Sequence, residues 1–383
     1  LFPALARAAG KVFYRLTLAG ERVPAAGPVL LVANHPNSLL DPVLVVAAAR
    51  RPVRFLAKAP LFTDPKMSWL VRAAGAIPVY RRADDPAQME KNLDTFRAVY
   101  AALGEGAAVG IFPEGVSHSE PALAPLKTGA ARIALGALAS TGRTFPVVPI
   151  GLVHREKDVF RSEAQVLIGQ PIPWDDLAAR GAEDPDAVRT LTERIATGLR
   201  KVTVNLDAWA DLPLVECVLE IWDAESGADR SAPSRLARLE AITNALAAIR
   251  SDPTSRWNGL VREAADYAQR LRRLRLSPRD LDADVRITAG MRWGIRRVYL
   301  VALPAMTMAV AGLVLFWIPY WVTRRIADVM RPDHDQRSSF KLLVGIAVYA
   351  VWVGLLAAAV GALVSWIAGA VTLLLAPAIG LMG

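Results

Sequence analysis

One apolar run leads straight into a polar turn near the start of the chain: residues 29–42 read VLLVANHPNSLLDP. The run VLLVA is typical of a buried strand, and Asp-Pro is a pair that often starts a helix. Between these two signals lie His35 and, after five intervening residues, Asp41. The chain has only four histidines, so a histidine and a carboxylate at a strand-to-helix turn are candidates for a general base and its orienting partner.

Further apolar runs of this kind follow, separated by amphipathic stretches. They are Val29–Ala33, Val53–Ala57, Ala76–Tyr80, Ala107–Phe112 and Val147–Leu152, with Gln165–Ile168 as a candidate for one more. Continuous apolar strands between helical patterns are typical of a parallel sheet covered on both faces. We therefore expect an α/β fold with a largely parallel sheet flanked by helices, and reactive residues along the rim where the strands end.

The patterns divide the chain into four expected regions. Residues 1–27 hold an amphipathic helix, for which association with a membrane and packing against the next domain are equally open. Residues 28–180 form the α/β domain, and residues 181–297 form a helical subdomain that ends in a basic run beside the membrane. Residues 298–383 are expected to be hydrophobic membrane segments.

Two stretches of this last region carry no charge at all. They run from Val298 to Val322 and from Leu342 to Gly383, and a membrane-spanning helix needs about 20 apolar residues. The first stretch contains Pro304 and Pro319, and arginines flank it on both sides. We expect it to form a re-entrant hairpin with both ends in the cytoplasm, because prolines break helices and positive flanks stay inside.

The net charge of +9 is unevenly placed, since nine arginines and three aspartates lie between Arg270 and Arg297. A basic run beside apolar segments favours anionic lipid headgroups as its partner. Nucleic acid is disfavoured, because no aromatic–basic interleaving or groove-reading motif accompanies the charge. Cys217 is the only cysteine and the histidines are scattered, so we expect no intrachain disulfide, no metal site and no cofactor.

The first motif also has an interpretation without chemistry. Asp is a favoured N-cap and Pro is favoured at the first helical position, so Asp41 and Pro42 could simply begin a helix. His35 would then be a turn histidine whose hydrogen bonds are satisfied. A second block argues for a site, since Ile111–Gly115 (IFPEG) follows another apolar run and brings Glu114 to a strand end.

Four blocks in this order resemble those of the glycerolipid acyltransferase superfamily, whose members move a fatty acyl group from a thioester onto glycerol phosphates or lysophospholipids. They are Asn34–Asp41, Gly75–Arg81, Phe112–Gly115 and Val148–Ile150. The spacing from His35 to Asp41 is one residue longer than the superfamily's common one, and it resembles the glycerol-3-phosphate/dihydroxyacetone-phosphate acyltransferase branch. Segments similar to that branch continue through Lys201–Asn205 and Tyr267–Leu276, so the resemblance covers most of the chain.

The resemblance implies a role for each motif residue. His35 would be the general base on the acceptor hydroxyl, and Asp41 would hold it and stabilise the imidazolium. Glu114 would orient the acceptor hydroxyls or brace the site. Arg81 would bind the acceptor phosphate, unless it forms a solvated charge pair with Arg82.

Five further positions are candidates for binding the substrates: Gly115, Ser117, Pro149, Lys58 and Lys127. The two lysines are more simply explained as surface residues. Val116 and Ser117 stand where the commoner pattern has Thr and Arg, which puts in doubt the phosphate contact of that Arg. No covalent enzyme nucleophile is expected, because a thioester leaves easily and the second Gly of a Gly-x-Ser-x-Gly elbow is missing.

These expectations describe a membrane-bound O-acyltransferase at a bacterial inner membrane, with its active site facing the cytoplasm. The expected acceptor is glycerol-3-phosphate, or dihydroxyacetone phosphate, acylated at sn-1 in phospholipid synthesis. Acyl-CoA or acyl carrier protein would be the co-substrate, and membrane lipids would be partners. Two alternatives stay open: acylation of lysophosphatidate or another lysophospholipid at sn-2, and a membrane-anchored binding protein without turnover.

Overall fold

The structure is a computed structural model that describes residues 2–65, 67–81, 90–154, 156–226, 232–252, 254–274, 303–330 and 337–380. The chain divides into two compact units, residues 1–279 and 280–383. The boundary expected at residues 297–298 and most of the basic run up to Arg297 lie outside the described residues.

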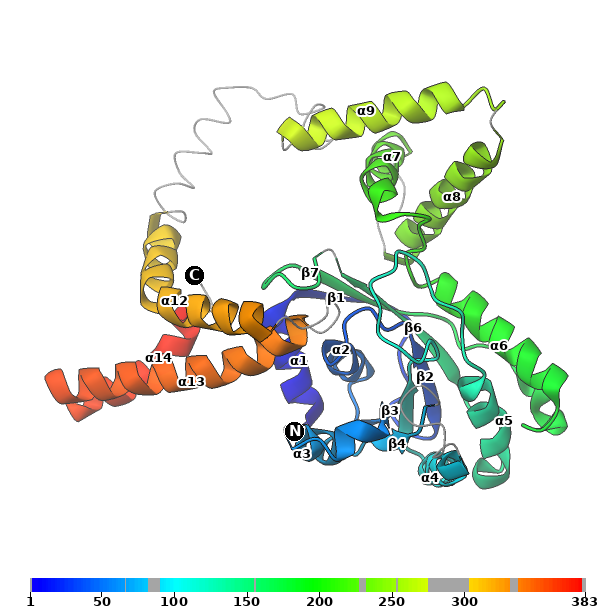
Figure 1. Ribbon diagram of the computed structural model, residues 1–383, viewed down its shortest axis with the longest axis horizontal. Coiled ribbons are helices and arrows are strands. Elements are labelled where there is room, and N and C mark those ends of the chain that lie inside the picture. Colours follow the sequence, from blue (N-terminus) through cyan, green and yellow to red (C-terminus); the bar gives the residue numbers. More distant parts are fainter. Residues whose placement is uncertain are drawn as a thin grey trace. The chain divides into compact units, whose positions relative to one another are not determined.

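In the described part of the first unit, seven strands form one sheet in the order β1-β7-β6-β2-β5-β3-β4 (Figure 1). Their bounds are β1 Arg15–Gly20, β2 Val29–Ala33, β3 Val53–Lys58, β4 Ile77–Val79, β5 Ala108–Ile111, β6 Val147–His154 and β7 Glu163–Ile168. Neighbouring strands are parallel except β6 and β7, which are antiparallel. The expected α/β fold with a largely parallel sheet is confirmed, and strands β2 to β6 all end at one rim.

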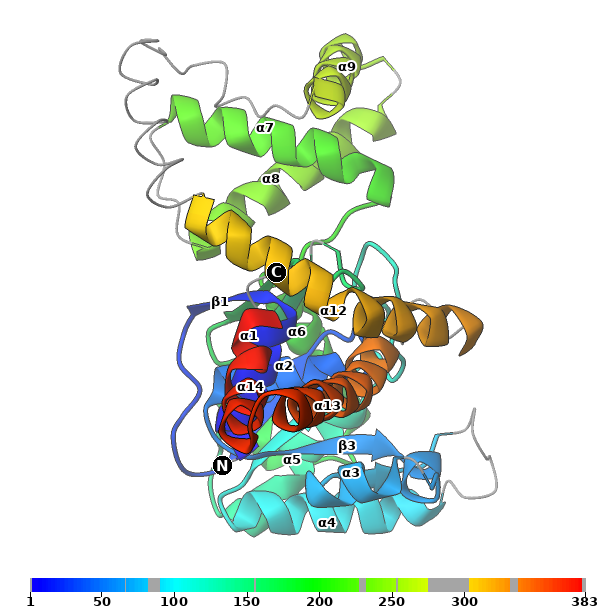
Figure 2. The same cartoon turned by 90° about the vertical axis from the view of Figure 1, so that its left-hand side faces the viewer.

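Helices cover both faces of this sheet (Figures 1 and 2). One face carries α1 (Phe2–Phe13) and α2 (Leu40–Ala49). The other face carries α4 (Asn92–Gly104), α5 (Gly129–Thr141) and α6 (Pro185–Arg200). Helix α3 (Ser68–Ala73) lies between β3 and β4 in the chain. A separate helical group follows, with α7 (Leu212–Glu225), α8 (Ala232–Ser251) and α9 (Asn258–Leu274). These three helices share their own apolar clusters.

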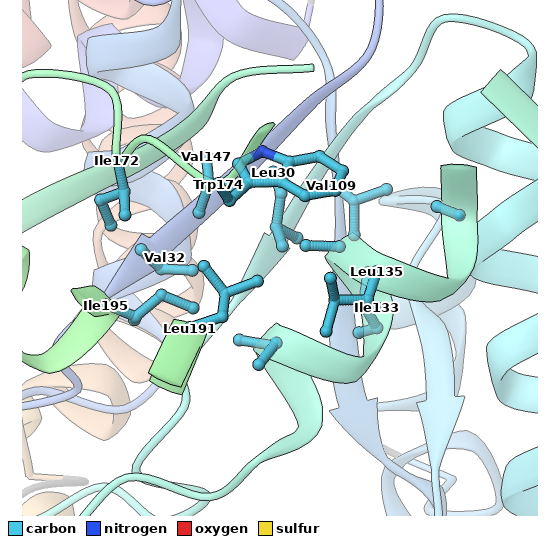
Figure 3. Close-up of a cluster of buried hydrophobic side chains, with 14 of the residues drawn as sticks. Leu30, Val32, Val109, Ile133, Leu135, Val147, Ile172, Trp174, Leu191 and Ile195 are labelled. Carbon is cyan, nitrogen blue, oxygen red and sulfur yellow. The ribbon is translucent and has the colours of Figure 1, made fainter. Parts of the chain in front are cut away.

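The main core lies between the sheet and helices α4 to α6 (Figure 3). Leu30 and Val32 of β2 meet Ile133 of α5 and Leu191 of α6 in this layer. Every residue of β2 is buried, which is why its sequence is apolar throughout instead of alternating. Each fully buried side chain of this size contributes about 1.5–3 kcal/mol through the hydrophobic effect, so β2 is a fixed base for the turn that follows it.

The N-terminal helix is shorter than the sequence indicates. α1 ends at Phe13, and residues 15–20, expected within the helical region that reaches residue 27, pair with β7 as an edge strand. Ala6 and Phe13 are buried, and a Cβ on Gly10 would lie 3.2 Å from Leu44 Cδ2 of α2. The apolar side of α1 therefore packs on α2, which supports the packing alternative.

The second unit contains α12 (Leu303–Met330), α13 (Arg337–Leu363) and α14 (Trp366–Gly380). α12 is one helix that includes Pro319, so the expected re-entrant hairpin is wrong in residues 303–322. Pro319 has no N–H for the carbonyl of Leu315 one turn earlier, and the indole N–H of Trp352 donates to that oxygen instead, at 2.9 Å. The helix can therefore continue through the proline.

Among the described residues, one segment is long and apolar enough to cross a membrane. It is Phe340–Leu363, with 24 residues, inside α13. The apolar part of α14, Trp366–Pro377, is shorter than a usual span. Only this single span is therefore supported, where the sequence suggested two stretches of sufficient length.

Candidate active site

Two loops that follow neighbouring parallel strands meet at the rim of the sheet. The loop after β2 carries His35, and the loop after β5 carries Glu114. His35 N donates to Glu114 Oε1 at 2.8 Å, and His118 N donates to His35 O at 3.1 Å. The parallel pairing of β2 and β5 thus joins two motifs that are 79 residues apart in the sequence.

His35 and Asp41 form a hydrogen-bonded pair. His35 Nδ1 lies 2.8 Å from Asp41 Oδ2; the Asp41 side chain is fully buried, and the His35 side chain is 19% exposed. Because the carboxylate occupies Nδ1, the neutral ring carries its proton there, and Nε2 is the nitrogen that can accept another. The pair has the arrangement of a general base and its orienting carboxylate.

The alternative in which Asp41 only caps a helix does not fit the structure. α2 begins at Leu40, its N-cap is Leu39, and no side chain caps it. Asp41 lies inside the first turn, and its Oδ2 accepts a hydrogen bond from Asn37 N at 2.6 Å as well as the one from His35. The carboxylate therefore accepts hydrogen bonds from the loop that precedes the helix.

Aromatic rings fix the plane of the His35 imidazole. Phe112 stacks on it with ring centroids 4.0 Å apart and an interplanar angle of 12°. Phe55 of β3 continues the stack on Phe112 at 5.6 Å. With Asp41 on its edge and Phe112 on its face, the ring has one orientation available.

Glu114 braces the site. Its side chain is almost completely buried, and both oxygens are occupied: Oε1 by His35 N, Oε2 by Ala124 N at 2.8 Å and by His118 Nε2. These contacts join the loop after β2 to both arms of the loop after β5. Of the two roles considered for Glu114, they favour bracing over orientation of acceptor hydroxyls.

Three positively charged side chains come from the same rim. Arg81 follows β4 and donates from Nη1 to Gly115 O at 3.0 Å. Gly115 has φ +76°, a conformation that favours glycine, and a Cβ there would lie 3.5 Å from Lys127 Cγ. Lys58 is the last residue of β3 and is exposed at this rim. The structure therefore brings Arg81, Gly115 and Lys127 together. Lys58 ends β3, the strand between β5 and β4 in the sheet.

The two remaining candidates are Ser117, which links two loops, and Pro149, which lies outside the site. Ser117 Oγ accepts a hydrogen bond from Ser38 N at 3.0 Å, so it joins the two motif loops. Pro149 pairs with Val32 inside the sheet instead of lying at its rim. It lines a separate cavity of about 590 Å³ together with Lys201 and Gly169. Pro149 is therefore not part of the His35 site.

Sequence reasoning missed a set of residues whose hydrogen bonds hold the loop that carries His35. Lys157, which follows β6, donates from Nζ to Pro36 O at 3.0 Å and also contacts Ser119 Oγ. It therefore links the loop after β2 to the loop after β5. Asn37 Nδ2 donates to Tyr14 OH at 2.7 Å. Tyr14 and Lys157 lie 23 and 120 residues from Asn37, and no spacing in the sequence links them to the motif.

Asn34 anchors the start of the motif loop to the next strand. Its Nδ2 donates to Leu152 O at 3.0 Å, and its Oδ1 accepts from Leu152 N at 2.7 Å. The side chain thus continues the pairing of β2 with β6 by one step beyond Ala33. In the parts of the chain that the structure describes, no three His, Cys, Asp or Glu side chains gather as metal ligands.

Part of the chain is similar to a known protein family. Residues 15–153, from β1 into β6, match the family model described as Acyltransferase. The domain formed by these residues is an acyltransferase-superfamily domain. The matched part contains His35, Asp41, Arg81 and Glu114, so the superfamily's domain and the rim site coincide.

Several curated relatives of this acyltransferase domain act on glycerol phosphates by name. Glycerol-3-phosphate O-acyltransferase 2 of Saccharomyces cerevisiae is 35% identical over 134 residues, 34% of this chain and 18% of that enzyme. Glycerol-3-phosphate O-acyltransferase 1 of the same yeast is 25% identical over 270 residues, 68% of this chain and 35% of that enzyme. A 1-acyl-sn-glycerol-3-phosphate acyltransferase of Chlamydomonas reinhardtii is 34% identical over 143 residues, 37% of this chain and 39% of that enzyme. Each match spans less than two fifths of the relative's length, and the names include two kinds of acceptor.

Proposed function

We propose that this protein is an O-acyltransferase that transfers a fatty acyl group from a thioester to a hydroxyl of a glycerol phosphate. The observation that carries the proposal is the partly exposed His35 ring, held on Nδ1 by the buried Asp41 at 2.8 Å. That arrangement suits a base that must remove a proton from an alcohol, because the carboxylate stabilises the imidazolium that forms.

The reaction needs no covalent enzyme intermediate. His35 Nε2 takes the proton from the acceptor hydroxyl as its oxygen attacks the thioester carbonyl carbon. The tetrahedral intermediate then collapses, the C–S bond breaks, and the leaving thiolate takes the proton from the His35 imidazolium. The products are an ester and a free thiol, and His35 returns to its neutral form. Asp41 stays ionised throughout and keeps the Nδ1–H tautomer in place.

The acceptor that we favour is glycerol-3-phosphate, or dihydroxyacetone phosphate, with acylation at sn-1. Arg81 donates to Gly115 O and the Lys127 side chain lies beside Gly115, next to the loop that carries Glu114, so a phosphate bound there would have two cationic side chains nearby. The names of the two yeast relatives support this acceptor class. The donor is acyl-CoA or acyl carrier protein, since either presents the same thioester.

The second candidate is acylation of lysophosphatidate or another lysophospholipid at sn-2. The Chlamydomonas relative, a 1-acyl-sn-glycerol-3-phosphate acyltransferase by name, favours it. Both acceptors carry a phosphate and a free hydroxyl, so the same base and the same cations would serve either one. A binding protein without turnover would give no product with any acceptor.

We further propose that the enzyme works at a bacterial inner membrane with His35 on the cytoplasmic side. The apolar segment Phe340–Leu363 is long enough to span a bilayer and supports an anchor. In cells, an Arg325→Cys variant made in a Cys217→Ala background should react with a membrane-impermeant maleimide only after the membrane is opened. Labelling of intact cells would contradict this orientation.

The deciding experiment uses the full chain, purified in detergent, with palmitoyl-CoA and radiolabelled glycerol-3-phosphate. We expect wild-type protein to move label into the lipid phase and His35→Ala to move none. Label with lysophosphatidate and labelled palmitoyl-CoA, but not with glycerol-3-phosphate, would select the sn-2 reaction. Equal label from wild type and His35→Ala would remove His35 from its role.

A matched pair of arginine variants tests the phosphate contact. Arg81→Ala should raise KM for the phosphorylated acceptor about 10- to 100-fold, because a hydrogen bond to a charged group contributes about 1.5–3 kcal/mol. Arg97→Ala removes an exposed arginine paired with Asp94 on α4 and should leave KM unchanged. An unchanged KM in Arg81→Ala would place the acceptor phosphate elsewhere.

A further inference from the structure

Two residues in the described part of the chain carry buried side-chain atoms without a hydrogen-bond partner. Among the described residues they are Asp41 Oδ1, His154 Nδ1 and His154 Nε2. Buried polar atoms are nearly always hydrogen-bonded, to protein or to internal water. His154 is the last residue of β6, and the proposed reaction gives it no task.

Two residues connect His154 with Asp41. Asn37 N donates to Asp41 Oδ2 at 2.6 Å, and Asn37 Nδ2 donates to Tyr14 OH at 2.7 Å. The Tyr14 ring in turn meets the His154 ring edge-on, with centroids 5.2 Å apart. Asp41 and His154 therefore border one buried polar region, with Asn37 and Tyr14 along its side.

Burial favours the neutral form of the His154 ring. Burial lowers the pKa of His154 below its ordinary value, the Asp41 carboxylate opposes that shift, and the Lys157 ammonium adds to it. Tyr14, between α1 and β1, is a further titratable group against the ring. A neutral imidazole has one N–H donor and one acceptor nitrogen, so it can donate one hydrogen bond toward a carboxylate.

We propose that His154 is a positioning residue for Asp41 and that the region between them is a binding site for internal water. The water accepts a hydrogen bond from a His154 ring N–H and donates one to Asp41 Oδ1. Asp41 is then held on both oxygens, by His35 and Asn37 on Oδ2 and by the water on Oδ1, so the carboxylate cannot turn away from His35. The positioning role rests on the proposed function, since it acts through the general base.

A crystal structure of the full chain tests the water site without any assay. We expect an ordered water about 2.7–3.2 Å from both Asp41 Oδ1 and a ring nitrogen of His154. No ordered water in contact with both residues would overturn the site. Because this measurement does not depend on turnover, it stands even if the proposed reaction proves wrong.

Kinetics test the positioning role once wild-type turnover has been established. His154→Leu should lower kcat about tenfold, leave KM for the acceptor unchanged and move the acid limb of the pH–rate profile to higher pH. The limb moves because the N–H dipole relayed by the water no longer offsets the negative potential of Asp41 at His35, so the imidazolium is favoured. His154→Gln keeps an N–H donor and should restore most of the rate.

Two outcomes would overturn the positioning role. One is a His154→Leu enzyme with the wild-type kcat and acid limb. The other is an equal loss of kcat in the Leu and Gln variants with an unmoved limb, which a purely structural histidine would give. The control is Thr203→Val, since the buried Thr203 hydroxyl donates to Leu199 O at 2.8 Å and lies outside the site. Absence of turnover in wild type would contradict the proposed function and leave the crystallographic test in place.

Discussion

His35 Nδ1 lies 2.8 Å from Asp41 Oδ2, although His35 belongs to the loop after β2 and Asp41 to the first turn of α2. The pair therefore depends on the path of only six residues, and the buried strand before it and the buried helix after it fix that path. A local pair of this kind keeps its geometry while substrates come and go, which is what an oriented base requires.

Asp41→Asn should separate the charge of the carboxylate from its shape. We expect kcat to fall about 10³- to 10⁴-fold, because the amide fills the same space but does not stabilise the imidazolium. KM for both substrates and the thermal unfolding midpoint should change little. Steady-state rates and a thermal melt on one preparation check this, and a variant that retains a tenth of the wild-type kcat would show that the Asp41 charge does not support the base.

Glu114 should affect stability and rate together. Glu114→Ala leaves two partly buried N–H groups, those of His35 and Ala124, without an acceptor, and should lower the free energy of unfolding by about 2–5 kcal/mol. Glu114→Gln keeps an acceptor oxygen and should lose less. Chemical denaturation gives the free energies. Glu114→Ala with wild-type stability but no activity would instead indicate direct contact with the acceptor.

Gly110 tests the aromatic stack behind His35. Gly110 pairs with Phe55 across β5 and β3, and a Cβ there would lie 2.4 Å from Phe55 Cε1. Gly110→Ala should therefore displace Phe55, Phe112 and finally His35, and lower kcat at least about tenfold with a loss of about 1–3 kcal/mol in stability.

The matched control is Gly259→Ala in α9, where a Cβ meets nothing within 4 Å. It should keep full activity and gain slightly in stability, since alanine favours helix. Equal activity of the Gly110→Ala variant and wild type would show that the stack does not position the imidazole.

The helical subdomain should carry a pH-dependent ion pair. Arg250 of α8 donates to both carboxylate oxygens of Asp211, at 2.6 and 2.7 Å, and holds the pKa of Asp211 below its ordinary value. A carboxyl whose pKa is lowered by folding stabilises the protein above its unfolded pKa of about 3.9, and the stabilisation is lost as the pH falls through the folded value. Arg250→Gln should therefore cost about 2 kcal/mol at pH 7 and progressively less below pH 4.

Unfolding midpoints across that pH range measure the difference between Arg250→Gln and wild type. Asp94→Asn, which opens an exposed pair with Arg97, should show no difference at any pH. A deficit in Arg250→Gln that is the same at pH 7 and at pH 3.5 would mean that the arginine acts through packing and not through the charge of Asp211.

Much of the α/β domain could be predicted from periodicity. The run Val29–Ala33 became β2 with the same bounds, and the other runs became β3 to β6, because strands buried on both faces must be apolar throughout. The meeting of His35 with Glu114 followed from parallel topology, which puts the carboxyl ends of neighbouring strands at one rim. Gln165–Ile168 became part of β7, but antiparallel to β6, a direction that hydrophobicity does not specify.

The wrong predictions share one physical cause, namely contacts between residues that are far apart in the sequence. Residues 15–20 lie in the region 1–27 expected to be helical, yet pairing with β7 holds them as a strand. Pro319 should interrupt a helix on local grounds, and an indole from another helix compensates for the missing N–H. Tyr14 and Lys157 reach the His35 loop only through the folded chain, so no motif could reveal them.

The contacts of Lys157, Asn34 and Glu114 have a consequence for how the enzyme comes into being. They join loops that are 121, 118 and 79 residues apart in sequence, so none of them can form from a local stretch of nascent chain. The site exists only after β2, β5 and β6 have all paired. Recovery of turnover during refolding should therefore coincide with the last cooperative step of folding. A protein with a truncated or partly paired sheet would be inactive.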